Sequence, residues 1–333
     1  MSSLKNRYEI VAIVEARMCN PNGDPNMANR PRSDRETNIG IITDAAIKSR
    51  IRKYIQHAYG DVENCEILIS DGTNLNKKIA ESVINTSGLK EENEIKKQEE
   101  AGQYMCKKYW DVRTFGGVLS TGLNAGQVRG AVQVSMSCSV DPIETRVDTI
   151  TRKCFVVSDQ KFTNLEDYDK ADEKMDSSAM RTMGTKAYTP FGLYVVKFSV
   201  SGNIAQKNGF SEEDLSKLME GILQMYNIDA SSSKMGMSVL SPLVVFKHVG
   251  VGTGNEIQNR NEALLGCAGS QRLFDLVKVK RKNDVDVPRS YEDYNITLDL
   301  SRLPKGVECG VKREFYDGVT WLNTNEKVDL MEF

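Results

Sequence analysis

The chain is poor in the residues that most metal and nucleophilic centres need. Its 333 residues include only two histidines, His57 and His248, and seven cysteines with no CxxC pair among them. So few histidines nearly exclude a histidine-rich metal centre or a His-dependent triad. An odd number of widely spaced cysteines argues against a disulfide framework or a zinc site. The sequence therefore predicts no metal and no cofactor.

Long apolar runs are also missing. No stretch approaches the roughly 18 residues needed to span a bilayer, and Met1–Arg7 lacks the apolar core of a signal peptide. Because 40% of the residues are hydrophobic and 27% are charged, the chain has enough apolar material for a sizeable core. We expect a soluble, cytoplasmic protein, with residues 1–333 forming a single domain.

A net charge of −2 hides an uneven distribution of charge. Residues 61–105 carry ten acids and five bases, and residues 158–178 carry seven acids and three bases. The remaining chain then holds 29 of the 46 acids and 36 of the 44 bases, a net of +7. Both acidic windows are typical of insertions, and the basic remainder can track a phosphate backbone through Coulomb attraction and counterion release.

Hydrophobic periodicity predicts an α+β protein. Thr43 or Asp44 can cap an amphipathic helix that runs to about Tyr59, and Ser211 with Asp214 forms a capping-box-like start for a second helix. The predicted strands are 7–15, 110–119, 127–140, 147–157, 190–202, 239–249 and 273–282. Residues 158–189 are too long for a turn and are expected to project as an extended hairpin or flap. This order fits an RRM-like (ferredoxin-like) sheet with large insertions.

Candidates for catalysis are few. Asp24, Asp34 and Asp44 could together hold Mg²⁺ for phosphodiester cleavage, although turn and cap roles already explain Asp24 and Asp44. The glycines of 250–254 lack the Gly-Lys-Ser/Thr of a P-loop, so we interpret them as a linker. A metal-dependent ribonuclease that uses Asp24 or Asp34 stays open as the alternative function.

Cations provide stronger evidence for binding than for catalysis. Arg30 and Arg32 stand in an irregular segment, and Arg113 and Arg129 lie beside glycines that let another backbone approach closely. Just over one helical turn also carries Lys48, Arg50, Arg52 and Lys53. A solvated helix face is the alternative for the helix, and a structural salt bridge is the alternative for the two arginines.

The excursion ends in a basic, apolar and glycine-containing segment, 180–186, that includes Arg181 and Met183. A methionine can wedge between bases because its flexible apolar side chain replaces stacking contacts. Ordinary packing of the methionine against the body of the protein is the alternative.

Several blocks in this order resemble one family, the backbone-forming subunit of type I CRISPR surveillance complexes (Cascade), specifically the type I-C kind, in the RAMP superfamily. The matching blocks run from about residue 6 to about 300, and they are 20–25, 31–32, 43–44, 111–116, 126–130, 181–184, 190–194, 245–248 and 273–276. The resemblance implies a modified RRM-like palm, with finger insertions at about 61–105 and a thumb hairpin at about 158–189.

The same resemblance implies a non-enzymatic protein that polymerises in a helical filament along the CRISPR RNA. The guide would then pair with target-strand DNA, so that base pairing carries the sequence reading. Other Cascade subunits, namely the large, small and handle-binding subunits, are the implied partners. The residues expected to bind RNA are Asn22, Arg30, Arg32, Lys48, Arg50, Arg52, Arg113, Gln127, Arg129, Arg181, Met183, Lys247 and His248. The RNP aromatic signature of ordinary RRMs is absent, so base stacking on the sheet face is not expected.

Overall fold

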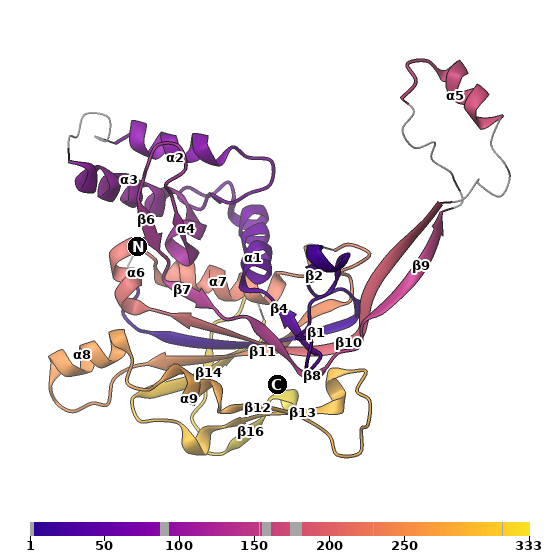
Figure 1. The fold of residues 1–333 in the computed structure, drawn as a ribbon. Helices are drawn as coiled ribbons and strands as arrows, with labels where there is room; N and C mark the ends of the chain where they lie inside the picture. The colour runs from indigo at the N-terminus through magenta and orange to yellow at the C-terminus, as the bar shows by residue number, and fades with distance from the viewer. Residues whose placement is uncertain are drawn as a thin grey trace.

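A large antiparallel sheet forms the centre of the protein (Figure 1). The computed structural model describes residues 3–86, 93–152, 154, 161–173, 182–228, 230–314 and 316–333. Strand β1 (Tyr8–Cys19) lies between β10 (Thr182–Val200) and β11 (Met237–His248). The sheet continues from β10 to β8 (Ser137–Pro142) and β4 (Ile39–Ile42), and from β11 to β14 (Val307–Lys312) and β15 (Thr320–Trp321).

Strand β1 is apolar on both of its faces. Ile10, Ala12 and Val14 belong to one hydrophobic cluster, whereas Val11 and Ile13 belong to a second cluster on the opposite side. A strand buried on both faces is held in the centre of a sheet, because either face would lose free energy if it were exposed to water. The sequence predicted this strand and one of its faces, and the second face explains its central position.

Two helices cover the first face of the sheet. Helix α1 (Asp44–Tyr59) is capped by the Thr43 hydroxyl, and α7 (Glu212–Gln224) begins with the capping box of Ser211 and Asp214. Their apolar stripes pack into the same cluster as the first face of β1. Both helices and both caps agree with the sequence prediction.

The opposite face of the large sheet is covered by a second, smaller sheet. Its strand order is β12 (Val277–Arg281), β13 (Tyr294–Asp299) and β16 (Lys327–Asp329), and Leu298 and Ile296 form part of the second hydrophobic cluster. The predicted strand 273–282 starts too early, because Leu273 belongs to the short helix α9 (Ser270–Phe274).

Residues of the first acidic window form a helical lobe. Helices α2 (Leu75–Ile84) and α3 (Glu94–Lys108) share a separate small core that includes Ile79, Val83 and Met105. The lobe lies beside α1 above the large sheet (Figure 1). The charged residues of α3 therefore form the outer face of a helix that is packed on its other side.

A two-stranded arm projects from the sheet (Figure 1). Strand β9 (Arg146–Arg152) pairs with the first residues of β10, with Arg146 opposite Tyr188 and Arg152 opposite Thr182. All of β9 is exposed, and helix α5 (Leu165–Asp172) lies beyond the paired strands. The hairpin predicted within 158–189 is thus placed differently: its first strand lies at 146–152, before that range, and only the residues 182–188 of its second strand lie inside it.

Two predicted strands are wrong. Residues 110–119 form the buried helix α4 (Trp110–Phe115) and only then the short strand β5 (Gly116–Val118). Residues 127–140 are divided into β6 (Gln127–Arg129), β7 (Val132–Val134) and the start of β8. Burial of Trp110, Val112 and Phe115 overrides the strand-type composition of the first segment.

The remaining described elements are short or peripheral. They are β2 (Gly23–Asp24), β3 (Arg30–Pro31), α6 (Gly202–Asn208), α8 (Glu256–Leu265) and the 3-10 helices Pro25–Met27, Tyr291–Asp293, Leu300–Arg302 and Leu330–Glu332. Across the described ranges, we find no helix with the length and apolar character of a membrane span.

Candidate nucleic-acid interface

The Asn20–Pro25 loop follows the end of β1 and contacts the start of α1. The Asn22 Oδ1 accepts a hydrogen bond from the Thr43 backbone N–H at 2.9 Å, and its carbonyl accepts one from the Arg32 N–H at 2.8 Å. Thr43 itself caps α1. The Asn22 side chain therefore positions the loop against the helix, and its oxygen is already engaged in the protein.

The turn at 232–236 contacts this loop through the side chain of Lys234. The Lys234 Nζ donates to the carbonyl oxygens of Asn20 at 2.5 Å and Pro21 at 2.8 Å. Burial, followed by repulsion from the Arg50 charge, lowers the pKa of Lys234 to about 8. The role of Lys234 could not be predicted from the sequence, because no local pattern around it indicates a contact across more than 200 residues.

Arg30 and Arg32 bring positive charge to the same loop region. Arg30 is exposed, whereas Arg32 is half-buried with its Nη2 3.5 Å from the Asp24 Oδ1. An exposed guanidinium keeps its donors available for a phosphate. Of the two, Arg30 is the better placed to meet a ligand.

The cations of α1 point in different directions. Lys48 and Arg52 lie one turn apart on the same face, and their charged groups stand 6.0 and 5.2 Å from the centre of the Phe115 ring. Arg50 instead stacks over Tyr226 at 5.3 Å, and burial lowers the pKa of its guanidinium. The predicted single cluster is therefore divided, with Lys48 and Arg52 on the side of the helical lobe.

Both cations on that face already have acidic partners. The Lys48 Nζ is 2.8 Å from the Asp44 Oδ2, and the Arg52 Nε is 2.8 Å from the Asp111 Oδ2. Asp111 is almost fully buried and also accepts the backbone N–H groups of Leu68 and Ile69 at 2.7 and 3.1 Å. Arg52 thus links α1 to the helical lobe, while Lys48 pairs with a partly exposed carboxylate that can exchange partners.

Arg113 is a structural residue in this arrangement, not the strand-borne phosphate contact that we expected. It is 5% exposed and forms a bidentate pair with Asp214, with Nε–Oδ2 and Nη2–Oδ1 distances of 2.9 and 2.8 Å. Burial alone would lower the pKa of Arg113, but the hydrogen bonds and charge of Asp214 raise it. The salt-bridge alternative describes its geometry.

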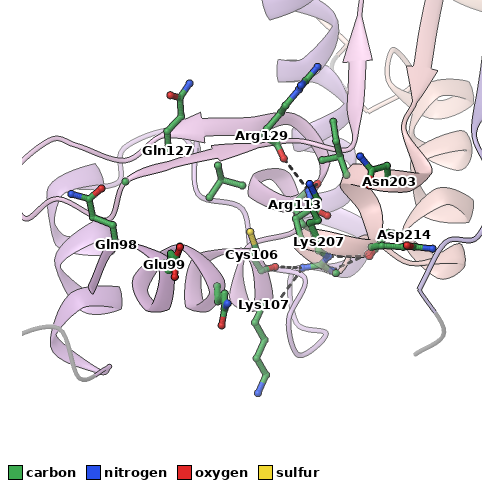
Figure 2. Close-up of a pocket in the computed structure, with 18 of the residues that line it drawn as sticks. Gln98, Glu99, Cys106, Lys107, Arg113, Gln127, Arg129, Asn203, Lys207 and Asp214 are labelled. Carbon is green, nitrogen blue, oxygen red and sulfur yellow. Dashed lines mark hydrogen bonds and ion pairs between the residues drawn. The ribbon is translucent and has the colours of Figure 1, made fainter. Parts of the chain in front are cut away.

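Gln127 and Arg129 are exposed on β6 at the edge of a pocket of about 1120 Å³ (Figure 2). Helix α3 and helix α6 form the other walls, with Lys107 and Lys207 as further cations. The Asn208 Nδ2 ties the pocket together, since it donates to the carbonyl oxygens of Arg113 and Arg129 at 2.7 and 3.1 Å. This pocket is adjacent to the Arg113–Asp214 pair but separate from the Asn20–Pro25 loop.

Met183 lies on the projecting arm and is 77% exposed. Its position opposite Thr151 places it near the end of the β9–β10 ladder, away from the large sheet. Arg181 lies outside the described residues. The packing alternative for Met183 is not supported by its exposure in the isolated chain.

Lys247 and His248 are far from the loop at the end of β1. Lys247 pairs with Tyr8, whereas Cys19 marks the other end of the same strand, about 36 Å away at 3.3 Å per residue. Lys247 stacks over Trp321 at 5.5 Å. These two residues therefore do not join the contacts predicted around the Asn20–Pro25 loop.

His248 is fully buried, so the expectation of an RNA contact through its side chain is wrong for this conformation. Its Nδ1 accepts the Cys267 backbone N–H at 3.0 Å, which leaves the Nε2 to donate to the Glu9 Oε2 at 2.7 Å. Burial raises the pKa of Glu9, but hydrogen bonds from His248 and Arg7 hold it below its ordinary value.

The three loop aspartates each have a structural partner. Asp24 accepts the Asn26 N–H, Asp34 accepts the N–H groups of Glu36 and Thr37, and Asp44 pairs with Lys48. Hydrogen bonds from Thr37 lower the pKa of Asp34, and the bond from Lys48 lowers that of Asp44. No group of three or more potential metal ligands occurs among the residues that the structure describes. The ribonuclease alternative gains no support.

The segment 20–32 meets α1 through the hydrogen bond from the Thr43 N–H to the Asn22 Oδ1, and we call the polar and cationic residues of these two elements the basic edge. The edge comprises Asn22, Arg30, Arg32, Lys48 and Arg52. The fold and this site together define a class: an α+β protein with a large antiparallel sheet, two helices on one of its faces and cations gathered at the end of its central strand. The sequence profile of the family "CRISPR-associated protein Cas7" matches residues 6–299, and the chain belongs to this family.

Two kinds of relative accompany the family match. A Haloferax volcanii protein described as CRISPR-associated protein Cas7 is 31% identical over 116 residues. That match spans 34% of this chain and only 33% of the relative. Two chains of structures titled as a CRISPR RNA-guided surveillance complex, one of them pre-nicking, align with TM-scores of 0.45 and 0.39. Their identities are 15% and 12%, and they cover 79% of this chain and 84% and 77% of their own.

Replacing Arg113 should cost stability because it leaves a buried carboxylate unpaired. We expect Arg113→Ala to lower the free energy of unfolding by about 3 to 5 kcal/mol, measured by urea denaturation. Arg129→Ala removes the same charge from an exposed site nearby and should change stability little. Equal effects of the two substitutions would contradict the structural role of Arg113.

The Glu9–His248 pair should make stability depend on pH. Because the pKa of Glu9 is lowered from its ordinary 4.5, its contribution is present above pH 4.5 and is lost as the pH falls through the lowered pKa. Glu9→Gln should therefore destabilise the protein at about pH 7 and progressively less as the pH falls below 4.5, in denaturant titrations in both pH ranges. A difference that is the same at both, or that appears equally in the exposed control Glu36→Gln, would refute this assignment.

Proposed function

We propose that this chain is a CRISPR RNA-binding backbone subunit of a type I-C Cascade-type complex. The family match over residues 6–299 carries the proposal. The basic edge formed by the Asn20–Pro25 loop and α1 supports it, because clustered cations on one edge attract a phosphate backbone without reading its bases. In this function, the subunit holds the guide, and base pairing with target-strand DNA supplies the sequence specificity.

The topology of the sheet supports an RRM-like palm. Four strands lie in the order β11-β1-β10-β8, with α1 between β1 and β8 in the chain and α7 between β10 and β11. This is the βαββαβ order of a ferredoxin-like unit. The helical lobe within about 61–105 is the proposed finger, and the arm around 158–189 is the proposed thumb.

The proposed role is non-catalytic. Carboxylates that would have to bind Mg²⁺ in a nuclease are instead engaged in caps, turns and ion pairs. We propose that further copies of the chain assemble along the guide in a helical filament, and that large, small and handle-binding subunits complete a cytoplasmic complex.

Co-purification tests the function directly. The protein should be isolated on a discrete RNA of repeat-spacer length when it is expressed with a CRISPR array, and this RNA should remain intact in Mg²⁺. Protein that elutes without RNA and ignores added guide at low salt would overturn the proposal. Mg²⁺-dependent cleavage that is lost in Asp24→Ala would replace it with a ribonuclease.

The basic edge should set the salt dependence of RNA binding. Arg30→Ala with Lys48→Ala should weaken binding to all RNA sequences, and the slope of log K against log salt should flatten by about 0.7 for each phosphate that the protein no longer neutralises. We leave Arg52 intact because its removal would leave Asp111 buried without its cation.

The matched control is Lys280→Ala with Lys282→Ala, which removes the same charge from exposed positions in and just beyond β12, in the smaller sheet. Affinity and slope should stay unchanged in this control. An equal loss of affinity in both double variants would show that net charge, not the basic edge, governs binding.

We expect Met183 to distort the bases of the bound RNA, and not only to contribute to the affinity for that RNA. Because it is exposed near the end of the arm's ladder, Met183→Gly should leave the fold intact and remove a base distortion that recurs along the bound guide. Chemical probing of the bound RNA measures the distortion. An unchanged probing pattern in a variant that still binds guide would reject the thumb assignment.

A further inference from the structure

Cys65 and Lys217 form a buried contact between two elements that lie far apart in the sequence. Cys65 lies in the connection between α1 and α2, and Lys217 lies in α7. The Lys217 Nζ donates a hydrogen bond to the Cys65 Sγ at 3.3 Å, and the two residues are 6% and 1% exposed. Because a lysine is almost never fully buried unless a partner holds its charge, this pair needs an explanation.

Positive charge surrounds the Cys65 sulfur. Besides the Lys217 ammonium, the buried Arg113 guanidinium lies close to it. Burial would lower the pKa of Arg113, but Asp214 and, to a smaller extent, the Cys65 sulfur raise it. The thiolate is the nucleophilic form of cysteine, and neighbouring Lys and Arg charges stabilise that form. The Cys65 sulfur therefore lies in the electropositive surroundings that are typical of reactive cysteines.

The other buried cysteines have different surroundings. Burial raises the pKa of the Cys19 and Cys106 thiols to about 11, and it also raises the pKa of the Cys309 thiol. A thiol with a raised pKa is protonated at neutral pH and reacts slowly. Among the described residues, Cys65 is the buried cysteine whose sulfur is in contact with a lysine amine.

A pocket beside Cys65 brings solvent close to this pair. The pocket of about 1120 Å³ is lined by Asn64, which precedes Cys65 in the chain, and by Arg113 and Asp214. Figure 2 shows Arg113 and Asp214 together at one side of this pocket. Hydrogen peroxide is little larger than a water molecule, so a local opening of this wall is enough to bring it to the sulfur.

We propose that Cys65 and Lys217 form an oxidation-dependent crosslinking site, at which hydrogen peroxide converts their contact into a covalent sulfur–nitrogen bond. The site is separate from the proposed function, because neither residue belongs to the basic edge. In the first step, the thiolate sulfur attacks a peroxide oxygen and the O–O bond breaks. Sulfur gives up an electron pair and becomes a sulfenic acid, while the leaving hydroxide takes up a proton to form water.

Lys217 then captures the oxidised sulfur. Burial would lower the pKa of Lys217, but Glu213 and then Cys65 raise it, and the support from Cys65 is lost when its sulfur becomes a neutral sulfenic acid. The Glu213 Oε1, 2.6 Å from the Nζ, takes one proton and frees the nitrogen electron pair. The amine attacks the sulfur, the S–O bond breaks, and the hydroxide leaves as water with a second proton from the nitrogen. The product is a sulfenamide.

Mass spectrometry of the peroxide-treated protein tests this site. The starting protein carries Cys138→Ser and Cys154→Ser, which remove the exposed thiols. A digest should contain a species that joins the Cys65 peptide to the Lys217 peptide, and the intact protein should have lost a pair of hydrogen atoms. The bond also constrains the unfolded chain, so it should raise the urea concentration at the midpoint of unfolding. Dithiothreitol should reverse both changes.

Matched variants separate the two chemical steps. Lys217→Arg keeps the buried positive charge but removes the amine, so dimedone should still trap the Cys65 sulfenic acid while the linked peptides are lost. Cys106→Ser removes another buried thiol and should leave the link unchanged. If Lys217→Arg does not fold, as judged by circular dichroism, Cys65→Ser replaces it and should also abolish the link.

Three results overturn the proposal. Peroxide may leave Cys65 unmodified in protein that is otherwise oxidised, which shows that the thiol is only structural. Cys65 may form the dimedone adduct without any linked peptide, which shows that Lys217 does not capture the sulfur. A link that persists in Lys217→Arg or in Cys65→Ser assigns the crosslink to other residues.

Discussion

Burial of β1 on both faces is the constraint on which the rest of the structure depends. Because helices α1 and α7 cover one side and the smaller sheet covers the other, the face of the central sheet cannot meet a ligand. Binding groups must come from the ends of strands and from the elements around the sheet. The Asn20–Pro25 loop, the exposed side of α1 and the arm lie outside these covered faces.

Burial also decides what each charged residue does. Arg113 and Arg129 stand in similar glycine-containing sequence, yet one is sealed against Asp214 and the other is exposed beside a pocket. The difference arises from α4, which turns Arg113 towards the start of α7. A charge that has been desolvated must be paired within the protein, so Arg113, Arg52 and Glu9 connect elements, whereas Arg30 remains available to solvent.

The sequence predicted a helix or strand correctly where the pattern that indicates it lies within that element. Helices α1 and α7 were predictable because their apolar spacing and their caps are local, and the part of β10 from residue 190 onwards was predictable from its β-branched and aromatic run. Helix α4 was not predictable, since its residues favour a strand and only their burial stabilises a helix. The failure at His248 is of the same kind, because its partner Glu9 lies 239 residues away. Even within α1 the cations that the sequence places together are divided by packing, since Lys48 and Arg52 lie over Phe115 and Arg50 lies over Tyr226.

Near the base of the arm, contacts hold together segments that lie far apart in the sequence. Lys234 holds the Asn20–Pro25 loop, Lys186 reaches the same segment from the arm, and Gly236 allows β1 to be paired there. The three contacts make the segment 231–236 a brace between the loop and the arm, two elements that local sequence does not connect.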